Sequence, residues 1–413
     1  MRRILLAFSA LSLSTAAYAA DRVIPEGSGH DWSGFYVGVG AGAGAVVHDV
    51  DLAGLLGFDG IGGEGVFGEV SVGYDRLVGP RFLVGAFLDG RLGNIGTRLE
   101  IPGGAIDAEA RYGFDAGVRL GYLVTPSTLA YVLGGYSWQR FELSSSPAGL
   151  DFDWDADGYV LGAGIETALT GNLTLKTEYR YAAYGAEDFG TGGLLALKSS
   201  MHTMRAGLNY RFGFDAGAPA SFETPAYDWT GVYVGGAVGA GGLAHDVDLG
   251  GGLLGFNGIG AEGVSGEVSV GYDHEFAGGW VAGVSVGGRY SLIATKLSAP
   301  GFALSVDADY GFDVLGRLGM KLGDATLAYV VGGYSWQHFD IDISTPPVGS
   351  VYDWDAHGYS VGAGVETALS ERAAVNVEYR YSAYEGEDFG APGFIDLKPS
   401  SHTVRAGLKF KLF

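Results

Sequence analysis

Apolar and polar residues alternate with a period of two along most of this chain. Between 111 and 122, one set of positions carries apolar side chains, namely Tyr112, Phe114, Ala116, Val118, Leu120 and Tyr122. The intervening positions carry charge or glycine: Arg111, Gly113, Asp115, Gly117, Arg119 and Gly121. Because successive side chains of a β-strand point to opposite faces, this pattern predicts strands with one apolar and one polar face.

Eight such strands are predicted in each half of the chain. The first set lies near 33–45, 64–75, 81–93, 109–124, 128–142, 157–169, 173–184 and 201–212. The second set lies near 230–242, 262–273, 279–291, 307–322, 326–340, 357–369, 373–384 and 401–412. In the first half, short links (76–80, 125–127, 170–172) alternate with long links (46–63, 94–108, 143–156, 185–200). This alternation is typical of outer-membrane barrels, which have short periplasmic turns and long external loops.

The two halves are copies of one unit. The segment from Gly68 to Asp75 returns unchanged from Gly266, and the segment from Gly134 to Gln139 returns from Gly332. The offset between matching residues stays between 197 and 200. A unit of about 185 residues is much longer than a solenoid repeat of about 20–50 residues, so it has the size of a domain.

The composition fits a surface that faces lipid. Hydrophobic residues make up 47% of the chain and charged residues 17%, and there are 74 glycines. Water-soluble domains carry about 25% charged residues. No segment beyond the N-terminus offers the ~18 consecutive apolar residues of a membrane-spanning helix, whereas a closed barrel needs only one apolar strand face. The predicted fold class is therefore all-β, a transmembrane antiparallel up-and-down β-barrel.

The N-terminus predicts export. Arg2 and Arg3 precede a mostly apolar stretch, and Ala17-Tyr18-Ala19 fits a signal-peptidase site. The expected organisation is a cleaved signal peptide at 1–20, an N-terminal linker at 21–30, a first barrel at 31–213, a periplasmic linker at 214–227 and a second barrel at 228–413. The expected location is the outer membrane, with the chain as an integral protein.

Three stretches resemble a known family: DWSGFYVGVGAGAG from Asp31, GYSWQ from Gly135 and HTMRAGLNYRF from His202. They are similar to the small outer-membrane β-barrel proteins of alphaproteobacteria, the outer membrane immunogenic protein or RopB-like group, which is related in architecture to the OmpA transmembrane domain. The resemblance implies an integral barrel with a structural or surface-exposed role in membrane integrity or surface interaction. Such proteins usually carry one barrel, whereas this chain carries two.

The duplicated strands would also fit one sixteen-stranded barrel. Eight strands enclose an interior that side chains can fill, whereas sixteen leave an aqueous channel. The junction at 213–227 contains Pro219 and Pro225 and is much longer than the other links on its side. Each half also retains its own start and end motifs. These features favour two tandem eight-stranded barrels, with one sixteen-stranded barrel as the alternative.

Eight charged positions on the predicted inward faces keep their charge in both halves. In the first half they are Glu69, Arg91, Asp115, Arg119, Glu166, Glu178, Arg180 and Arg205. In the second they are Glu267, Arg289, Asp313, Arg317, Glu366, Glu378, Arg380 and Arg405. Each half holds four acids and four bases, and buried charges need partners. The equal numbers favour a barrel-interior charge network that plugs the lumen, with a proton or ion path as the alternative.

Two other groups suggest chemistry but lack essential members. Asp153, Asp155 and Asp157 have the spacing of a calcium loop, yet the position twelve residues along is Gly164 rather than glutamate. His202 and His402 would suit a lipid-modifying barrel enzyme, but no orienting acid accompanies them in the sequence. We therefore expect no catalytic site, no metal and no cofactor.

Composition also limits the partners. The chain has 47 acidic and 25 basic residues and no cysteine, so neither a nucleic-acid interface nor a disulfide is expected. The expected partners are outer-membrane lipid, lipopolysaccharide and the barrel-insertion machinery, for which Phe413 supplies a terminal aromatic residue. No loop carries a motif that identifies an extracellular partner. The favoured function is structural and surface-exposed; a porin-like diffusion channel is the alternative, followed by a lipid-modifying enzyme.

Overall fold

The computed structural model describes residues 30–52, 56–101, 104–146, 149, 151–189, 195–213, 222–249, 254–299, 302–345, 348–389 and 395–412. The predicted signal peptide, most of the N-terminal linker, residues 214–221 of the periplasmic linker and Phe413 lie outside these ranges. Within the described residues, no helix is long and apolar enough to cross a membrane.

Eight long antiparallel strands form the first half. They are β1 (Gly34–Leu52), β2 (Leu56–Val78), β3 (Phe82–Ile101), β4 (Gly104–Thr125), β5 (Thr128–Ser146), β6 (Asp151–Ala168), β7 (Leu173–Tyr184) and β9 (Leu195–Phe212). A three-residue strand, β8 (Glu187–Phe189), pairs with the beginning of β9. The eight predicted strands of this half lie within the long strands, apart from single residues at 33, 81 and 169.

The second half repeats this order. Its long strands are β10 (Gly231–Leu249), β11 (Leu254–Phe276), β12 (Trp280–Ala299), β13 (Phe302–Gly323), β14 (Thr326–Thr345), β15 (Val348–Ala368), β16 (Ala373–Tyr384) and β18 (Ile395–Lys411). The short β17 (Glu387–Phe389) pairs with β18 as β8 pairs with β9. The predicted strands are again contained in the observed ones, apart from single residues at some ends.

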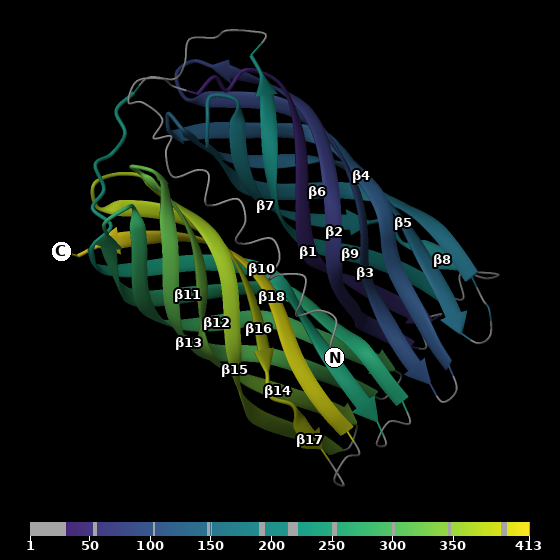
Figure 1. The fold of residues 1–413 in the computed structure, drawn as a ribbon. Coiled ribbons are helices and arrows are strands. Elements are labelled where there is room, and N and C mark those ends of the chain that lie inside the picture. Colours follow the sequence, from purple (N-terminus) through teal and green to yellow (C-terminus); the bar gives the residue numbers. More distant parts are fainter. Residues whose placement is uncertain are drawn as a thin grey trace.

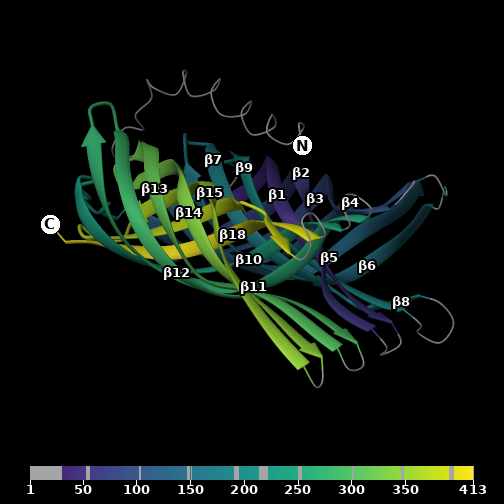
Figure 2. The same cartoon turned by 90° about the horizontal axis from the view of Figure 1, so that it is seen from below.

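Each half closes on itself. The first strand, β1, pairs on one side with β2 and on the other with β9, from Phe35↔Phe212 to Asp51↔Ala196. In the second half, β10 pairs with β11 and with β18, from Tyr233↔Lys411 to Leu249↔Ile395. The chain therefore forms two eight-stranded barrels, and the sixteen-stranded alternative is wrong. Figures 1 and 2 show the barrels against each other along one side, where β2 also pairs with β12.

The predicted long links are wrong in extent. β1 and β2 extend into the predicted link 46–63 until residues 52 and 56, and β3 and β4 extend into 94–108 until residues 101 and 104. The alternation of apolar and polar residues fades there because both faces can be polar outside the lipid. The backbone groups still need hydrogen-bond partners, so the strand pairing continues. The predicted short turns are confirmed.

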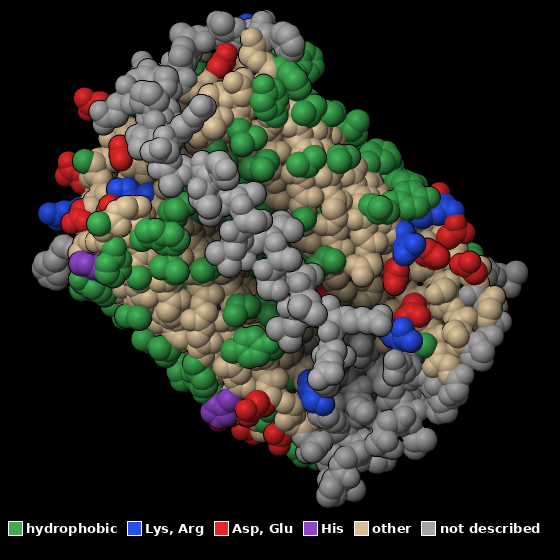
Figure 3. Space-filling view, viewed as in Figure 1, with side chains coloured by type: hydrophobic (Ala, Val, Ile, Leu, Met, Phe, Trp, Pro, Cys, Tyr) green, Lys and Arg blue, Asp and Glu red, His purple; other side chains and the backbone are tan. Residues whose placement is uncertain are grey.

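The apolar strand face is the outer wall. Val118 and Leu120 are each 57% exposed, whereas Asp115 and Arg119 on the other face of β4 are buried. Figure 3 shows hydrophobic side chains over the outer surface and charged ones gathered toward its ends. The predicted inward position of Arg111 is wrong. It lies at an irregularity in the β4–β5 register and pairs with surface carboxylates instead of pointing inward.

Candidate functional site

The inward side chains nearest the periplasmic end of the first barrel form one ion-paired cluster. Arg119 on β4 pairs with Asp75 on β2 and, at 2.8 Å, with Glu166 on β6. Arg211 on β9 pairs with the same two acids, at 2.8 Å to Asp75 and 2.9 Å to Glu166. None of the four side chains is more than 3% exposed. The two planar guanidinium groups, each of which offers five donors, therefore connect four strands across the lumen.

A second cluster lies further toward the cell-surface end of the same barrel. Arg180 on β7 is at its centre and pairs with Asp89, with Glu178 at 2.5 Å and with Asp115 at 2.8 Å. Arg91 on β3 donates to the other oxygen of Asp115 at 2.7 Å. The Asp115 carboxylate therefore holds two arginines, which come from opposite sides of the barrel.

Glu69 on β2 completes this second cluster. It accepts from Lys176 on β7 at 2.9 Å and also pairs with Arg205 on β9. The hydroxyl of Tyr131 donates to Glu178 at 2.7 Å, which gives that carboxylate a neutral partner besides its arginines. Every predicted inward charge of the first half thus has a partner of opposite charge.

The second barrel repeats the upper cluster. Arg380 on β16 pairs with Glu378 at 2.5 Å, Asp313 at 2.6 Å and Glu267 at 3.2 Å. Arg289 on β12 donates to Asp313 at 2.6 Å, as Arg91 does to Asp115. Arg405 also pairs with Glu267 in this cluster, as Arg205 pairs with Glu69. Near the periplasmic end, Arg317 pairs with Glu366 at 2.6 Å. All sixteen predicted inward residues therefore have ion-pair partners.

Six inward charges lie outside the predicted network: Asp75, Asp89, Lys176, Arg211, Asp273 and Lys409. With them, the ion pairs join six acids and six bases in the first barrel, and five acids and five bases in the second. Asp75 and Asp273 match between the halves, but each was placed at the end of a predicted strand. Comparing the two halves for shared charges could not identify Asp89 and Lys176, because the equivalent residues of the second half are Gly287 and Asn376.

Aromatic side chains lie below and above the charged region of each lumen. Before β1, the buried Trp32 donates from its indole nitrogen to the carbonyl oxygen of Pro126 at 2.9 Å, across the periplasmic mouth. Trp229 makes the matching bond to Asp324 at 3.3 Å. Toward the surface end, the ring of Phe141 stacks on Trp154 at 5.1 Å. The inward face is therefore apolar above the ion pairs and closed by an indole below them.

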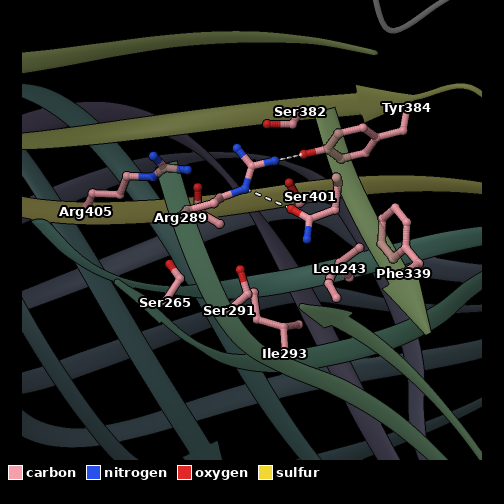
Figure 4. A pocket seen from close by; sticks show the side chains of 13 residues that line it. Leu243, Ser265, Arg289, Ser291, Ile293, Phe339, Ser382, Tyr384, Ser401 and Arg405 are labelled. Atoms are coloured by element: carbon pink, nitrogen blue, oxygen red, sulfur yellow. Dashed lines mark hydrogen bonds between the residues drawn. The ribbon is translucent and has the colours of Figure 1, made fainter. Parts of the chain in front are cut away.

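The second lumen contains two small cavities beside its ion pairs. One cavity of about 20 Å³ lies beside Arg289, Ser291 and Tyr384 (Figure 4). Another of about 50 Å³ lies beside Ser285 and Asn376. A water molecule needs roughly 10–15 Å³ of such space, so these cavities are large enough for one to a few waters.

The acidic triplet lacks the geometry of a calcium-binding loop. Asp153, Asp155 and Asp157 lie on β6 with their side chains on one exposed face, not in a loop. Arg140 on β5 pairs with Asp153 and, at 2.6 Å, with Asp155. In the described part of the chain, no group of three or more His, Cys, Asp or Glu side chains could hold a metal ion.

The two histidines lie on the outer wall, where the barrels meet. His202 Nε2 lies 2.9 Å from Glu262, and Ser200 donates to the same carboxylate at 2.6 Å. His202 Nδ1 lies 2.6 Å from the Tyr179 hydroxyl. The serine is bonded to the acid and not to the imidazole, so this is not the order of a nucleophile–base–acid relay. The acid missing from the sequence analysis comes from the other half of the chain.

Comparison with known proteins identifies the family. The model of the family described as outer membrane protein beta-barrel domain matches twice, at residues 4–212 and 214–410. This chain belongs to that family. The predicted resemblance, the outer-membrane location and the barrel fold are thereby confirmed, and the two matches follow the two barrels.

Three relatives match about half of this outer-membrane barrel protein or less. The 31 kDa outer-membrane immunogenic protein of Brucella melitensis is 28% identical over 240 residues, which are 51% of this chain and 100% of the relative. The 22 kDa outer membrane protein of Rhizobium leguminosarum bv. viciae is 31% identical over 40% of this chain and 70% of its own length. Outer membrane protein A of Klebsiella aerogenes is 30% identical over 24% of this chain and 27% of its own length. These are names of outer-membrane proteins and not of enzymes.

Proposed function

We propose that the protein is a structural, surface-exposed component of the outer membrane whose two barrels are plugged and do not conduct solutes. The observation that carries this proposal is the ion pairing of both lumens. Side chains from opposite strands meet across each barrel, as Arg180 of β7 meets Asp115 of β4 at 2.8 Å and Asp89 of β3. An ion that crosses the first lumen would have to separate buried ion pairs, at several kcal/mol for each charge.

The ion-paired barrel walls support a role in presenting the outer ends of the strands at the cell surface. Apart from β7 and β16, which have 12 residues each, the long strands continue past the apolar band. Their surface ends carry paired charges such as Arg140 with Asp155. A plugged barrel anchors such strands without any opening in the membrane. The role is non-enzymatic, because the histidine and serine near Glu262 lack the order of a catalytic relay.

A porin-like channel is the second candidate, and only the second barrel favours it. At four inward positions this barrel carries smaller residues: Ser265, Ser285, Gly287 and Asn376 stand where the first has Phe67, Phe87, Asp89 and Lys176. All four line the two water-sized cavities. If this protein conducts at all, current should therefore pass through the second barrel.

Single-channel recording of the purified, full-length protein in planar bilayers separates the two candidates. The plugged barrels should give no stable openings of nanosiemens size, and stable openings of that size would contradict the proposal. The variant Ser265→Phe with Ser285→Phe returns first-barrel residues to the second lumen. Its heat-modifiable migration on a gel checks that the barrels have folded. A wild-type current that this variant abolishes would assign a channel to the second barrel.

A further inference from the structure

The outer walls of the two barrels touch at equivalent positions of the two halves. Thr128 at the start of β5 and Thr326 at the start of β14 have their hydroxyl oxygens 2.9 Å apart. Gly62 of β2 faces Gly260 of β11 so closely that a Cβ on Gly62 would lie 2.5 Å from the Gly260 Cα. Contacts between equivalent residues arise on a two-fold axis. Because the threonines are periplasmic and the glycines lie toward the surface, this axis runs along the barrels, and both barrels point the same way.

Backbone pairing between the barrels obeys the same symmetry. Residues 57–59 of β2 pair antiparallel with 296–298 of β12, and residues 255–257 of β11 pair with 98–100 of β3. The second pairing joins the residues equivalent to those of the first pairing, with the two halves of the chain exchanged. Near the surface end, each barrel therefore adds a short length of strand to the other, and backbone donors and acceptors that would otherwise need water are paired.

A carboxylate on the outer wall of each barrel bonds to a histidine of the other. Glu262 on β11 lies 2.9 Å from His202 Nε2 on β9, and Glu64 on β2 lies 2.5 Å from His402 Nε2 on β18. Each histidine holds a tyrosine hydroxyl with its Nδ1, at 2.6 Å for Tyr179. The geometry fits an imidazole that donates to the carboxylate and accepts from the tyrosine, which fixes its tautomer.

These acids would be unfavourable on a barrel wall that faced lipid. Glu64 follows directly above the outward row of Val66, Val70 and Val72, which are among the exposed large hydrophobic residues of β2. A charged group on the lipid face of a barrel is destabilising, increasingly so toward the middle of the membrane. The histidine of the opposite barrel removes this penalty, so the wall is suited to a partner and not to lipid.

Small and hydroxyl-bearing residues let the remaining wall approach its partner. Outward positions of β6 become buried near the periplasmic end, where Ile165 is 3% and Thr167 2% exposed, while Leu161 on the same face is 55% exposed. The second barrel repeats this burial at Val365 and Thr367. Small residues that permit close approach, and polar groups that bond across the contact, are the usual means of association between membrane-embedded elements.

We infer that each barrel carries a self-complementary docking surface, and that its partner is the other barrel of the same chain, held as a fused two-fold pair. Each half supplies both an acid and a histidine, so the pairing is reciprocal. The surface consists of the Glu64–His402 and Glu262–His202 bonds at the outer end and the Thr128–Thr326 contact at the inner end. This inference concerns the outer walls and is independent of whether the lumens conduct.

Disulfide cross-linking in the full-length chain tests the pair. The protein has no cysteine, so Thr128→Cys with Thr326→Cys introduces one pair of thiols on the proposed axis. In the oxidising periplasm the disulfide should form nearly completely. The matched control is Leu120→Cys with Leu318→Cys, equivalent positions that are 57% and 49% exposed on the outer wall. Fixed docking should make the first pair oxidise at least about tenfold faster than the control. Equal rates in the two variants would overturn the inference.

The histidine–acid bonds need their own test. Glu64→Gln and Glu262→Gln, added together to the Thr128→Cys/Thr326→Cys chain, should lower its oxidation rate several-fold because the outer contact loosens. Glu142→Gln changes an acid that pairs with Arg111 away from this contact, so it should leave the rate unchanged. Heat-modifiable migration on a gel checks that each variant has folded. An unchanged rate in the Glu64/Glu262 variant would refute the role assigned to these bonds.

Discussion

Phe67 in the first barrel and Ser265 in the second occupy the same inward position, and the two lumens differ around them. The guanidinium of Arg205 packs over the ring of Phe67, 5.1 Å from the ring centroid. Ser265 instead lines a cavity of about 20 Å³ next to Arg405. The aromatic ring thus fills space in one barrel where the other has a cavity.

Replacing that ring should destabilise the first barrel. Phe67→Ser removes a buried ring that is packed against a charged group, and large-to-small changes of this kind cost about 3–5 kcal/mol. Urea unfolding of the protein in lipid vesicles measures the loss. Ser265→Ala is the matched control and should change the unfolding free energy by less than about 1 kcal/mol, because it removes one oxygen beside a cavity. Equal losses in the two variants would contradict the difference in packing.

Glu166 should contribute strongly to the stability of the periplasmic cluster. It accepts from Arg119 at 2.8 Å, Arg211 at 2.9 Å and the Thr174 hydroxyl at 2.5 Å. Glu166→Ala would leave two buried guanidiniums short of one partner, which we expect to cost about 3–5 kcal/mol of unfolding free energy. Glu109→Ala breaks an exposed pair with Arg111 and should cost less than about 1 kcal/mol. A loss of under about 1 kcal/mol in the Glu166 variant would argue against the cluster as a stabilising element.

Asp89 and Lys176 should be energetically coupled, because the second barrel has lost both. Asp89 pairs with Arg180, and Lys176 donates to Glu69 at 2.9 Å. Asp89→Gly alone leaves a surplus positive charge in the lumen, and Lys176→Asn alone leaves a surplus negative one. The double variant restores neutrality, so its loss of unfolding free energy should be smaller than the sum of the single losses by about 0.5–3 kcal/mol. Additive losses in the four-variant cycle would show that neutrality of the lumen does not matter.

The strands and their pairing could be predicted from the sequence because the information is local. A period of two fixes which face is apolar, and a short turn such as that before Thr128 pairs each strand with the next. The extent of the strands could not be predicted in this way, since pairing outside the lipid depends on backbone hydrogen bonds and not on apolar side chains. The strand ends at Leu52 and Leu56 therefore lie well inside a predicted loop.

The site was predicted only where both halves carry the same charge. Requiring the same charge in both halves identifies Arg119 and Arg317, whose partners are also shared. The same requirement excludes Lys176 from the predicted network, because the equivalent residue of the second barrel is uncharged. The partner of His202 could not be predicted from the sequence for a different reason. Glu262 lies in the other half and meets the histidine only when two barrel walls dock, and no periodicity within one strand contains that contact.

His30 should make the stability of the first barrel depend on pH. It lies before β1 at the periplasmic mouth, where its ring packs edge-on against Trp32 at 4.6 Å and its Nδ1 lies 3.3 Å from the Thr170 carbonyl oxygen. Burial and, to a smaller extent, the charge of Arg211 lower its pKa from 6.5 to about 4, while Glu166 opposes the shift. The folded barrel therefore favours the neutral imidazole, whereas the unfolded chain protonates it near pH 6.5.

The sign of the effect follows from this difference. Above pH 6.5 both states hold the neutral ring, so the contribution of His30 to stability is fully present there. As the pH falls toward about 4 the unfolded chain binds a proton that the folded barrel does not, and stability should fall by up to about 3 kcal/mol. The matched variant is His30→Tyr, because Tyr227 occupies this position in the second half and packs on Trp229 at 4.8 Å. Urea unfolding between pH 7 and pH 4 should show a shallower loss in the variant than in the wild type, and parallel curves would mean that His30 is not the group responsible.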